Sequence, residues 1–308
     1  MAIKIGSINI SEKKGTVKKP VTEVVIDEFG IQGDAHAGAW HRQISLLGRD
    51  SIHTFEEKAG RKIKSGEFAE NIILEGIDLS AVSLLDRFRI NEVLLEVTQI
   101  GKACHGDGCP IYIAVGDCVM PREGLFTRVL KSGSFKTGDP VTYIPKSFKI
   151  TIITLSDRAS RGEYQDLSGP KVKELLEIHF KKHRWHITFE QIIITDDAAK
   201  LKLELLKARG DGVDIVFTTG GTGIGPRDIT PEVVTEMADR LLPGVMDHIR
   251  LKYGKNNPNA LLSRSVAGVM GNSLIYALPG SVKAVEEYVR EILQTLEHTV
   301  SMLHGLGH

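Results

Sequence analysis

The segment with the clearest chemical character is TTGGTGIGPRDITPE, Thr218 to Glu232, which holds four glycines, two prolines, an arginine and an aspartate. It follows the apolar run VDIVFTT, and its glycines let backbone N–H groups approach an anion closely. Thr230 as N-cap and Pro231 at the first helical position predict a helix start there, which attracts phosphate. The loop lacks the G-K-[ST] ending of a P-loop and the spacing of a dinucleotide fingerprint. A turn without a ligand, with Asp228 as a local cap, is the alternative.

Carboxylates also follow other expected strands. Asp196 stands after the run WHITFEQIIIT, and Asp228 lies in the Gly-rich loop. If the two converge, they offer the oxygen ligands with which Mg²⁺ is held between phosphates. Asp196 could instead be the N-cap of a helix over 198–209, a common use of aspartate. Asp157 and Arg158, in LSDR, could form only a surface ion pair of little energetic value.

The three cysteines, Cys104, Cys109 and Cys118, lie within fifteen residues of one another in the first half. Cys104, His105 and Cys109 are close enough in sequence to share a soft metal. Alternatively, one cysteine is a thiolate activated by neighbouring basic groups. Burial in an apolar core is the common fate of cysteine and suits Cys118 best. The odd count, without a signal peptide, argues against a disulfide framework.

The second half of the chain alternates between strands and helices that can position these groups. Strands are expected at residues 148–156, 185–195, 213–219 and 271–278, and helices at 168–183, 197–210, 230–241, 243–262 and 281–303. Such alternation predicts a parallel sheet covered by helices on both faces. Ligands bind at the carboxyl ends of the strands in such sheets, so the polar loops should converge there.

The first half has a different pattern. Short segments rich in Val, Ile and Thr, at 21–27, 42–48, 88–101 and 139–144, are separated by Gly and Asp turns and predict strands. One helix is expected at 49–60, ending on Gly60. The glycine density favours a compact, strongly bent β barrel or sandwich. We expect two domains, at 1–146 and 147–308.

Composition is ordinary for a globular protein. The 308 residues suggest about two domains, and 42% are hydrophobic and 25% charged. Basic and acidic residues both number 39, so no bulk field favours nucleic acid. No apolar run approaches the roughly 20 residues that span a bilayer, and the N-terminus lacks a secretory h-region. We expect a cytoplasmic protein that binds neither membrane nor nucleic acid.

The segments TLSDRASRGEYQDLSGP, TTGGTGIGPRDITPE, LSRSVAG and LIYALPGSVKAVEE together resemble the molybdopterin adenylyltransferase family. The resemblance covers about residues 148–300. It implies a three-layer α/β domain of the molybdenum-cofactor-binding fold, usually trimeric. It also implies transfer of AMP from ATP to the terminal phosphate of the pterin molybdopterin, with Mg²⁺ and release of pyrophosphate.

The resemblance also implies site residues. The family's two functionally critical aspartates correspond to Asp196 and Asp228, which would also hold Mg²⁺; Asp197 is an alternative to Asp196 in the TDD triplet. The substrate cleft would be lined by Ser156, Asp157, Arg158, Gly220, Gly221, Thr222, Gly223, Ser263, Arg264, Leu278, Pro279 and Gly280. Phosphoryl-type transfer needs alignment and charge stabilisation more than covalent chemistry. No nucleophilic side chain and no pyridoxal phosphate are called for, because the pterin phosphate itself attacks.

The segments GIQGDAHAGAWHRQISLLG, GEFAENIILEGIDL and EVTQIGKACHGDGC resemble the MOSC domain, named after the C-terminal region of molybdenum cofactor sulfurase. The resemblance spans about residues 5–145. It implies a β-rich fold that binds molybdenum cofactor or handles its sulfur. The family's most typical cysteine matches Cys104, and Cys109 and His105 are candidates to assist it or to bind metal.

Four further residues belong to this second resemblance. His36 and His41 would lie near the cofactor pocket, or be ordinary surface or core histidines. Arg122 and Arg128 are candidates for the cofactor phosphate, a contact to which arginine is well suited. Both could equally be surface residues.

The two resemblances point to one pathway, molybdenum cofactor biosynthesis. We expect the C-terminal half to adenylylate molybdopterin and the N-terminal half to bind the cofactor or handle its sulfur. A non-catalytic carrier or scaffold for molybdopterin or molybdenum cofactor is the alternative. Expected partners are molybdopterin and ATP, and beyond them a molybdate-insertion protein or molybdoenzymes. A homotrimer through the C-terminal domain is also expected.

Overall fold

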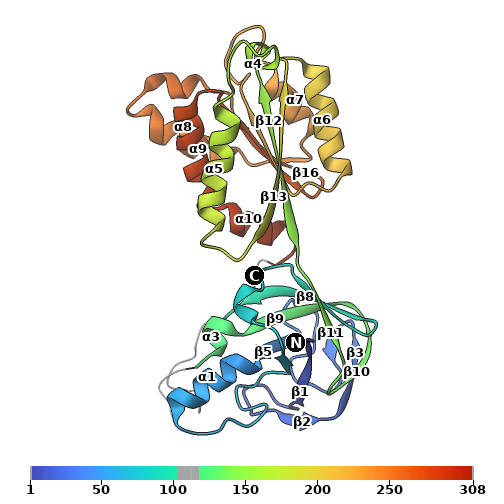
Figure 1. Cartoon of the computed structure of the whole chain (residues 1–308). Coiled ribbons are helices and arrows are strands. Elements are labelled where there is room, and N and C mark those ends of the chain that lie inside the picture. Colours follow the sequence, from blue (N-terminus) through green and yellow to red (C-terminus); the bar gives the residue numbers. More distant parts are fainter. Residues whose placement is uncertain (1, 103–111, 113–117, 307–308) are drawn as a thin grey trace. The chain divides into compact units, whose positions relative to one another are not determined.

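The computed structural model describes residues 2–102, 112 and 118–306. The chain divides into two compact units, Met1–Lys146 and Ser147–His308 (Figure 1). The first unit is β-rich, and the second alternates strands and helices. Each unit is described by itself. None of the helices in the described part of the chain combines the length and the apolar character that a membrane span requires.

The N-terminal unit is built on an eight-stranded sheet. The strand order is β11 (Val141–Ile144), β7 (Arg87–Ile90), β8 (Val93–Ile100), β9 (Leu125–Lys131), β5 (Ile44–Gly48), β6 (Ile72–Glu75), β1 (Lys4–Ile10) and β2 (Lys19–Val21). Only β5 and β6 pair in parallel. A smaller antiparallel sheet has the order β10 (Gly133–Lys136), β3 (Glu23–Asp27) and β4 (Gly30–Ile31).

The large sheet bends until its ends approach each other. The N–H of Ile5 donates to the carbonyl of Asp139 at 3.0 Å, and the N–H of Val141 donates to the carbonyl of Ile3 at 2.9 Å. These bonds lie between the start of β1 and the start of β11, although no continuous ladder joins the two strands. The concave side encloses an apolar core of residues such as Ile8, Ile44 and Phe88.

Helices of the N-terminal unit cover a second apolar cluster. Helix α1 (Arg49–Ala59) ends on Gly60 in the left-handed region, φ 64°, as predicted. Its Phe55 packs edge-on against Phe68. Short elements η1 (Leu79–Ala81) and α3 (Met120–Glu123) complete the described part of this unit. Cys118 is buried in the same cluster, the apolar environment that its sequence context favoured.

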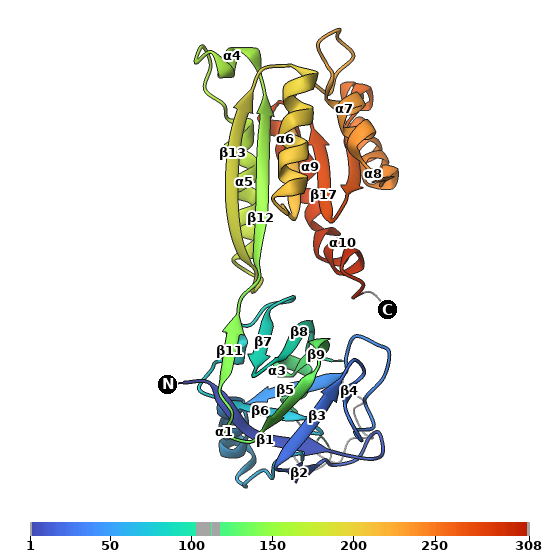
Figure 2. The ribbon, with the colours of Figure 1, turned by 90° about the vertical axis from the view of Figure 1, so that its right-hand side faces the viewer.

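The C-terminal unit has a six-stranded mixed sheet between helices (Figure 2). The strand order is β13 (His186–Ile194), β12 (Ser147–Leu155), β14 (Ile215–Thr219), β17 (Ser273–Leu278), β16 (Val266–Met270) and β15 (Arg240–Leu241). The first four strands are parallel, and the last two are antiparallel to their neighbours.

Helices cover both faces of this sheet. Helices α5 (Ser168–Phe180) and α9 (Val282–Leu293) pack together on one face, and α6 (Ala198–Gly210) and α7 (Thr230–Met237) pack together on the other (Figures 1 and 2). Helix α8 (Pro243–Gly254) contacts α9 and β16. The remaining elements are α4 (Asp157–Ser160), η3 (Pro258–Leu262) and α10 (Leu296–Leu303). The predicted three-layer α/β arrangement is therefore present.

Several details differ from the sequence prediction. Strand β16 was not expected, and it makes the sheet mixed rather than parallel. The expected helix over 281–303 is two helices, because the chain turns at Gln294 and Thr295 so that Leu296 and Val300 become buried. Helix α7 ends at Met237 rather than continuing to residue 241. Helix α6 ends at Gly210, and the left-handed glycine that follows it is Gly212.

Candidate functional site

The loops that follow β12, β14 and β17 meet at Gly220. Its N–H donates to the carbonyl of Leu278 at 3.0 Å. Its φ is +98°, and a Cβ there would lie 2.4 Å from the carbonyl oxygen of Leu155. A Cβ on Gly280 would lie 3.3 Å from the Cα of Gly220. Only glycine meets both the backbone angle and the close approach at position 220, which fixes how the Gly-rich loop leaves the sheet.

Asp157 and Asp196, which follow β12 and β13, are joined by two hydrogen bonds between backbone and side chain. The N–H of Asp157 donates to the carboxylate of Asp196, and the N–H of Asp196 donates to the carboxylate of Asp157, each at 3.2 Å. Asp197 accepts hydrogen bonds from the N–H groups of Ala199 and Lys200 and is the N-cap of α6. The capping role that the sequence offered to Asp196 therefore belongs to Asp197. Asp196 lies instead at the strand edge.

The Gly-rich loop reaches this pair through Arg227. The Arg227 guanidinium forms an ion pair with the carboxylate of Asp157. The next residue, Asp228, accepts a 2.8 Å hydrogen bond from the N–H of Gly225, so its carboxylate lies over the loop's own backbone. A continuous series of contacts thus runs from Asp196 through Asp157 to Arg227, the neighbour of Asp228. The two predicted aspartates belong to one edge of the sheet.

The Arg264 guanidinium forms hydrogen bonds to two separate points of the Gly-rich loop. Its Nε donates to the carbonyl of Gly223 and its Nη2 to the carbonyl of Asp228, both at 2.7 Å. Its remaining guanidinium nitrogen pairs with Glu232, and this contact lowers the pKa of the Glu232 carboxyl. The N–H of Arg264 also donates to the carbonyl of Thr222 at 2.9 Å. With these donors engaged, Arg264 acts on the shape of the loop.

Thr230 does not have its predicted role as an N-cap. Helix α7 has Ile229 at the N-cap, without a side-chain cap hydrogen bond, and Pro231 in its first turn. The Thr230 hydroxyl instead donates to the carbonyl of Gly220 at 2.9 Å. It is buried and ties the start of the helix to the start of the loop.

Other predicted cleft residues have local contacts of their own. The Ser156 hydroxyl accepts from the N–H of Ala159 and caps α4. Arg158 is exposed and lies over the ring of Tyr164, with 5.4 Å from Cζ to the ring centroid. The Ser263 hydroxyl pairs with the hydroxyl of Ser265 at 2.8 Å. Ser156 and Ser263 therefore flank the loop contacts already described.

A second candidate site is a cavity of about 310 Å³ in the N-terminal unit. Its lining carries positive charge from Lys14, Arg42 and Lys102, together with His36 and the aromatic ring of Trp40. The lining residues in the described part of the chain include no carboxylate. Such a wall favours an anionic ligand.

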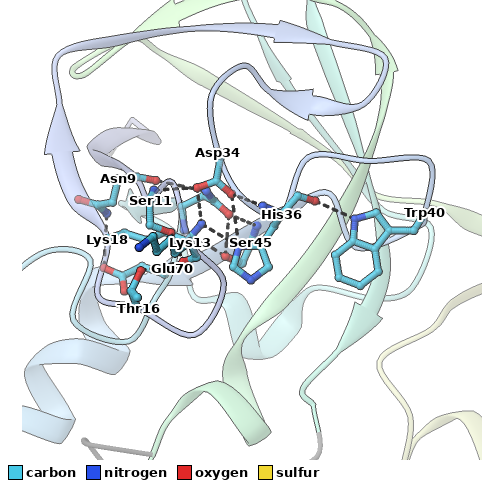
Figure 3. A network of polar contacts seen from close by, with 11 residues as sticks. Asn9, Ser11, Lys13, Thr16, Lys18, Asp34, His36, Trp40, Ser45 and Glu70 are labelled. Atoms are coloured by element: carbon cyan, nitrogen blue, oxygen red, sulfur yellow. Dashed lines mark hydrogen bonds and ion pairs between the residues drawn. The ribbon is translucent and has the colours of Figure 1, made fainter.

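His36 is in contact with a buried polar network that includes Lys18 and Asp34 (Figure 3). The Lys18 ammonium lies 2.5 Å from Asp34 Oδ2 and 3.2 Å from His36 Nδ1. Burial alone would raise the pKa of Asp34, but hydrogen bonds from His36 and Lys18 outweigh it and hold that pKa well below its usual value. Burial raises the pKa of the nearby Glu70, although two backbone N–H groups donate to its carboxylate. His36 is thereby fixed as part of the cavity wall.

Arg42 has the clearest capacity for a ligand among the cavity residues. Its guanidinium carbon lies 4.8 Å from the centroid of the Trp40 ring. Its Nε is buried without a hydrogen-bond partner in the described structure, as is Nδ1 of His41. Arg128, by contrast, is held by Glu96 at 2.7 Å. Buried donors normally find an acceptor, so the Arg42 guanidinium is suited to an anion entering the cavity.

Each of the two units contains a match to a known protein family. The probable molybdopterin binding domain matches residues 151–298, and the MOSC domain matches residues 33–109. The molybdopterin adenylyltransferase of Helicobacter pylori strain J99 is 34% identical over 161 residues, which cover 52% of this chain and 90% of that protein. The chain belongs to the molybdopterin adenylyltransferase family. The corresponding enzyme of Pyrococcus furiosus is 35% identical over 50% of this chain and 92% of its own length.

Among solved structures, the molybdopterin biosynthesis Mog protein of Mycobacterium ulcerans is 34% identical, with a TM-score of 0.47 over 51% of this chain and 99% of that one. The family models and the sequence relatives confirm the two predicted resemblances, to the molybdopterin adenylyltransferase family and to the MOSC domain. The match to the molybdopterin binding domain lies within the C-terminal unit, and the match to the MOSC domain lies within the N-terminal unit.

The cavity lining can be compared with the residues that the sequence suggested for the MOSC region. His36, Arg42 and Lys102 line its described part, and that described lining does not include His41, Arg122 or Arg128. Arg42 stands one residue after His41, and Lys102 two before Cys104, so proximity to the quoted motifs was the available signal. The predicted thiol and metal candidates Cys104, His105 and Cys109 lie outside the described residues.

Proposed function

We propose that the C-terminal unit transfers AMP from ATP to the terminal phosphate of molybdopterin. The observation that carries the proposal is the junction of the Asp157–Asp196 pair with the Gly-rich loop through Arg227. It lies at the carboxyl ends of parallel strands, where ligands bind in such sheets. Membership of the adenylyltransferase family supports the same activity.

The reaction follows from the groups at this edge. A phosphate oxygen of molybdopterin attacks the α-phosphorus of ATP, an O–P bond forms, and the bond to the β-phosphate breaks to release pyrophosphate. Backbone N–H groups of the Gly-rich loop between Gly221 and Gly223 are donors for phosphate oxygens. At the start of α7, the N–H of Thr230 already donates to the carbonyl of Gly221, and Pro231 has no N–H. Alignment and charge stabilisation carry most of such a reaction. Arg227 supplies a cation beside the aspartates.

Asp196 and Asp228 are the proposed ligands for Mg²⁺. Their carboxylate oxygens are the donors that Mg²⁺ prefers. Among the described residues, neither aspartate belongs to a cluster of three acidic or histidine side chains that could bind one ion. Mg²⁺ in nucleotide sites commonly uses one or two carboxylates together with substrate phosphates, so the type and number of these donors suit the ion. When bound, the ion would neutralise charge on the departing pyrophosphate.

We further propose that the N-terminal unit is a barrel-like MOSC domain whose cavity holds the anionic end of the pterin cofactor. The bonds between the starts of β1 and β11 support the bent shape, and Arg42, Lys14 and Lys102 support an anionic ligand. Cys104 is the proposed thiol for cofactor binding or sulfur handling. A thiol metal site with Cys109 and His105 is the competing role.

The proposed function also concerns how the chain oligomerises and which proteins receive its product. We propose a homotrimer through the C-terminal unit and delivery to a molybdate-insertion protein or a molybdoenzyme, as the resemblance to the adenylyltransferase family implies. A carrier that binds pterin without turnover is the competing function, and turnover distinguishes the two.

The test is pyrophosphate release by the full chain with ATP, Mg²⁺ and molybdopterin, compared with Asp228→Asn. We expect the variant to keep its circular dichroism spectrum and lose most AMP transfer, since a neutral amide ligates Mg²⁺ poorly. Equal turnover by the folded variant would refute the role of Asp228. Tight pterin binding without pyrophosphate release from the parent chain would establish the carrier instead.

A further inference from the structure

Two histidines and a glutamate meet at the end of the C-terminal sheet away from the Gly-rich loop. His179 lies in the last turn of α5, and His183 follows the helix four positions later. Glu297 lies in the first turn of α10. Residues four apart at a helix end face the same side, so both imidazoles are directed to one neighbour.

The three side chains are already close enough to share an ion. Glu297 Oε1 lies 3.1 Å from His179 Nε2 and 3.0 Å from His183 Nδ1. One ligand atom from each residue lies within 4.8 Å of the other two. Two ligand atoms bound tetrahedrally to Zn²⁺ at about 2.0–2.1 Å are separated by about 3.4 Å. Small side-chain movements would therefore complete three corners of a tetrahedron.

The fold holds these ligands in place. The His179 and His183 rings stack with centroids 4.4 Å apart. His179 also packs edge-on against Phe180, whose other neighbour is the ring of Trp185. Glu297 is placed by the turn that divides α9 from α10, since that turn buries the preceding Leu296. Both imidazoles and the carboxylate are thus attached to packed elements.

Exposure leaves room for a further ligand. The His179 side chain is 20% exposed, His183 34% and Glu297 38%. A water molecule can therefore occupy the fourth position. The neighbouring Lys181 and Lys182 are exposed, and solvent screens their repulsion of a cation.

We propose that His179, His183 and Glu297 form a binding site for a divalent transition metal, with Zn²⁺ as the best-suited ion. Imidazole and carboxylate ligands favour such ions over Mg²⁺. The bound ion would clip α10 to the end of α5. This site is separate from the proposed Mg²⁺ ligands Asp196 and Asp228, and it does not depend on the adenylyltransferase proposal.

The chain offers a matched control in His248. That histidine lies 3.2 Å from Glu291, but the same carboxylate is paired with Lys252 at 2.7 Å and contacts only one imidazole. A lysine ammonium in that position disfavours a metal cation. His248→Gln therefore removes a histidine–glutamate pair without removing the proposed site.

The experiment is Zn²⁺ titration calorimetry on the untagged full chain carrying Cys104→Ser and Cys109→Ser, so that thiols do not compete. We expect one tight Zn²⁺ per chain. His183→Gln should weaken its affinity at least about 100-fold, since even changing a residue that only hydrogen-bonds a metal ligand costs about 10- to 100-fold. His248→Gln should leave the affinity unchanged. Co²⁺ bound in place of Zn²⁺ should give ligand-field absorption without a thiolate charge-transfer band.

Folding is checked by the thermal midpoint of each metal-free variant. His183 lies outside the helix, so His183→Gln should match the parent; if it does not, Glu297→Gln replaces it in the same titration. Zn²⁺ should raise the midpoint of the parent but not of the ligand variant. Absence of tight Zn²⁺ binding, or equal affinity in the ligand variant and the parent, would overturn the proposal.

Discussion

Replacing Arg264 by lysine or methionine tests whether the guanidinium shapes the Gly-rich loop. Arg264 makes two charge-assisted hydrogen bonds, to the carbonyls of Gly223 and Asp228, both at 2.7 Å. Each such bond contributes about 1.5–3 kcal/mol. A lysine ammonium has no planar fork and can replace only part of this arrangement, and methionine replaces none of it.

The Arg264 side chain is 36% exposed, so solvent screening places each bond at the lower end of that range. Loss of one bond then costs about 1.5–2 kcal/mol, and loss of both costs about 3 kcal/mol. If the loop must be ordered in the transition state, these values correspond to falls in kcat/KM of about 10- to 30-fold for lysine and roughly 150-fold for methionine.

Pyrophosphate release with ATP, Mg²⁺ and molybdopterin gives kcat and KM, and hydrogen exchange of the ligand-free protein reports loop order. Both variants should exchange faster at residues 220–228. Arg290→Lys, a change in an exposed pair with Glu286, is the control. If Arg264 only attracted phosphate, lysine would retain most activity and exchange would not change. Wild-type exchange in both variants would refute the positioning role.

Three further changes probe other parts of the structure. Gly220→Ala introduces a Cβ against a backbone carbonyl at positive φ, so the free energy of unfolding measured in urea should fall by at least about 2 kcal/mol. Gly210→Ala is the control, because there is open space around Gly210 and the change should not destabilise the fold. Lys18→Met leaves the buried Asp34 without its ion-pair partner and should cost about 3–5 kcal/mol in urea unfolding, with recovery when Asp34→Leu is added; wild-type stability of the single variant would contradict this account. Arg42→Met should weaken binding of inorganic phosphate to the full chain at least about 10-fold by calorimetry, and an unchanged affinity would remove the anion assignment of the cavity.

The sequence predicted the elements whose residue pattern is regular. The four parallel strands are runs of apolar and β-branched residues, and helices α5 and α6 have 13 residues each, so each element appears within a few residues of its expected bounds. The sequence could not tell which of Asp196 and Asp197 caps the following helix, because either carboxylate could do so. In the structure Asp197 is the N-cap, and Asp196 accepts a hydrogen bond from Asp157, the first residue of α4, which follows a different strand. Similarly, Asp34 and Glu70 stand in separate motifs, and only the fold brings both to Lys18.

The missed strand β16 also explains why the role of Arg264 could not be seen in the sequence. LSRSVAG reads as a polar loop, and the strand that begins at its end, VAGVM, has five residues including Gly268, too few to show a strand period. Because β16 runs antiparallel to β17, Val266 pairs with Ala277, near the carboxyl end of β17. Arg264, two residues earlier, is therefore delivered to the edge where the parallel strands end. Had residues 266–270 continued in the direction of β17, the same arginine would lie at the opposite edge, far from the Gly-rich loop. The direction of one short strand therefore determines which residues can shape the site.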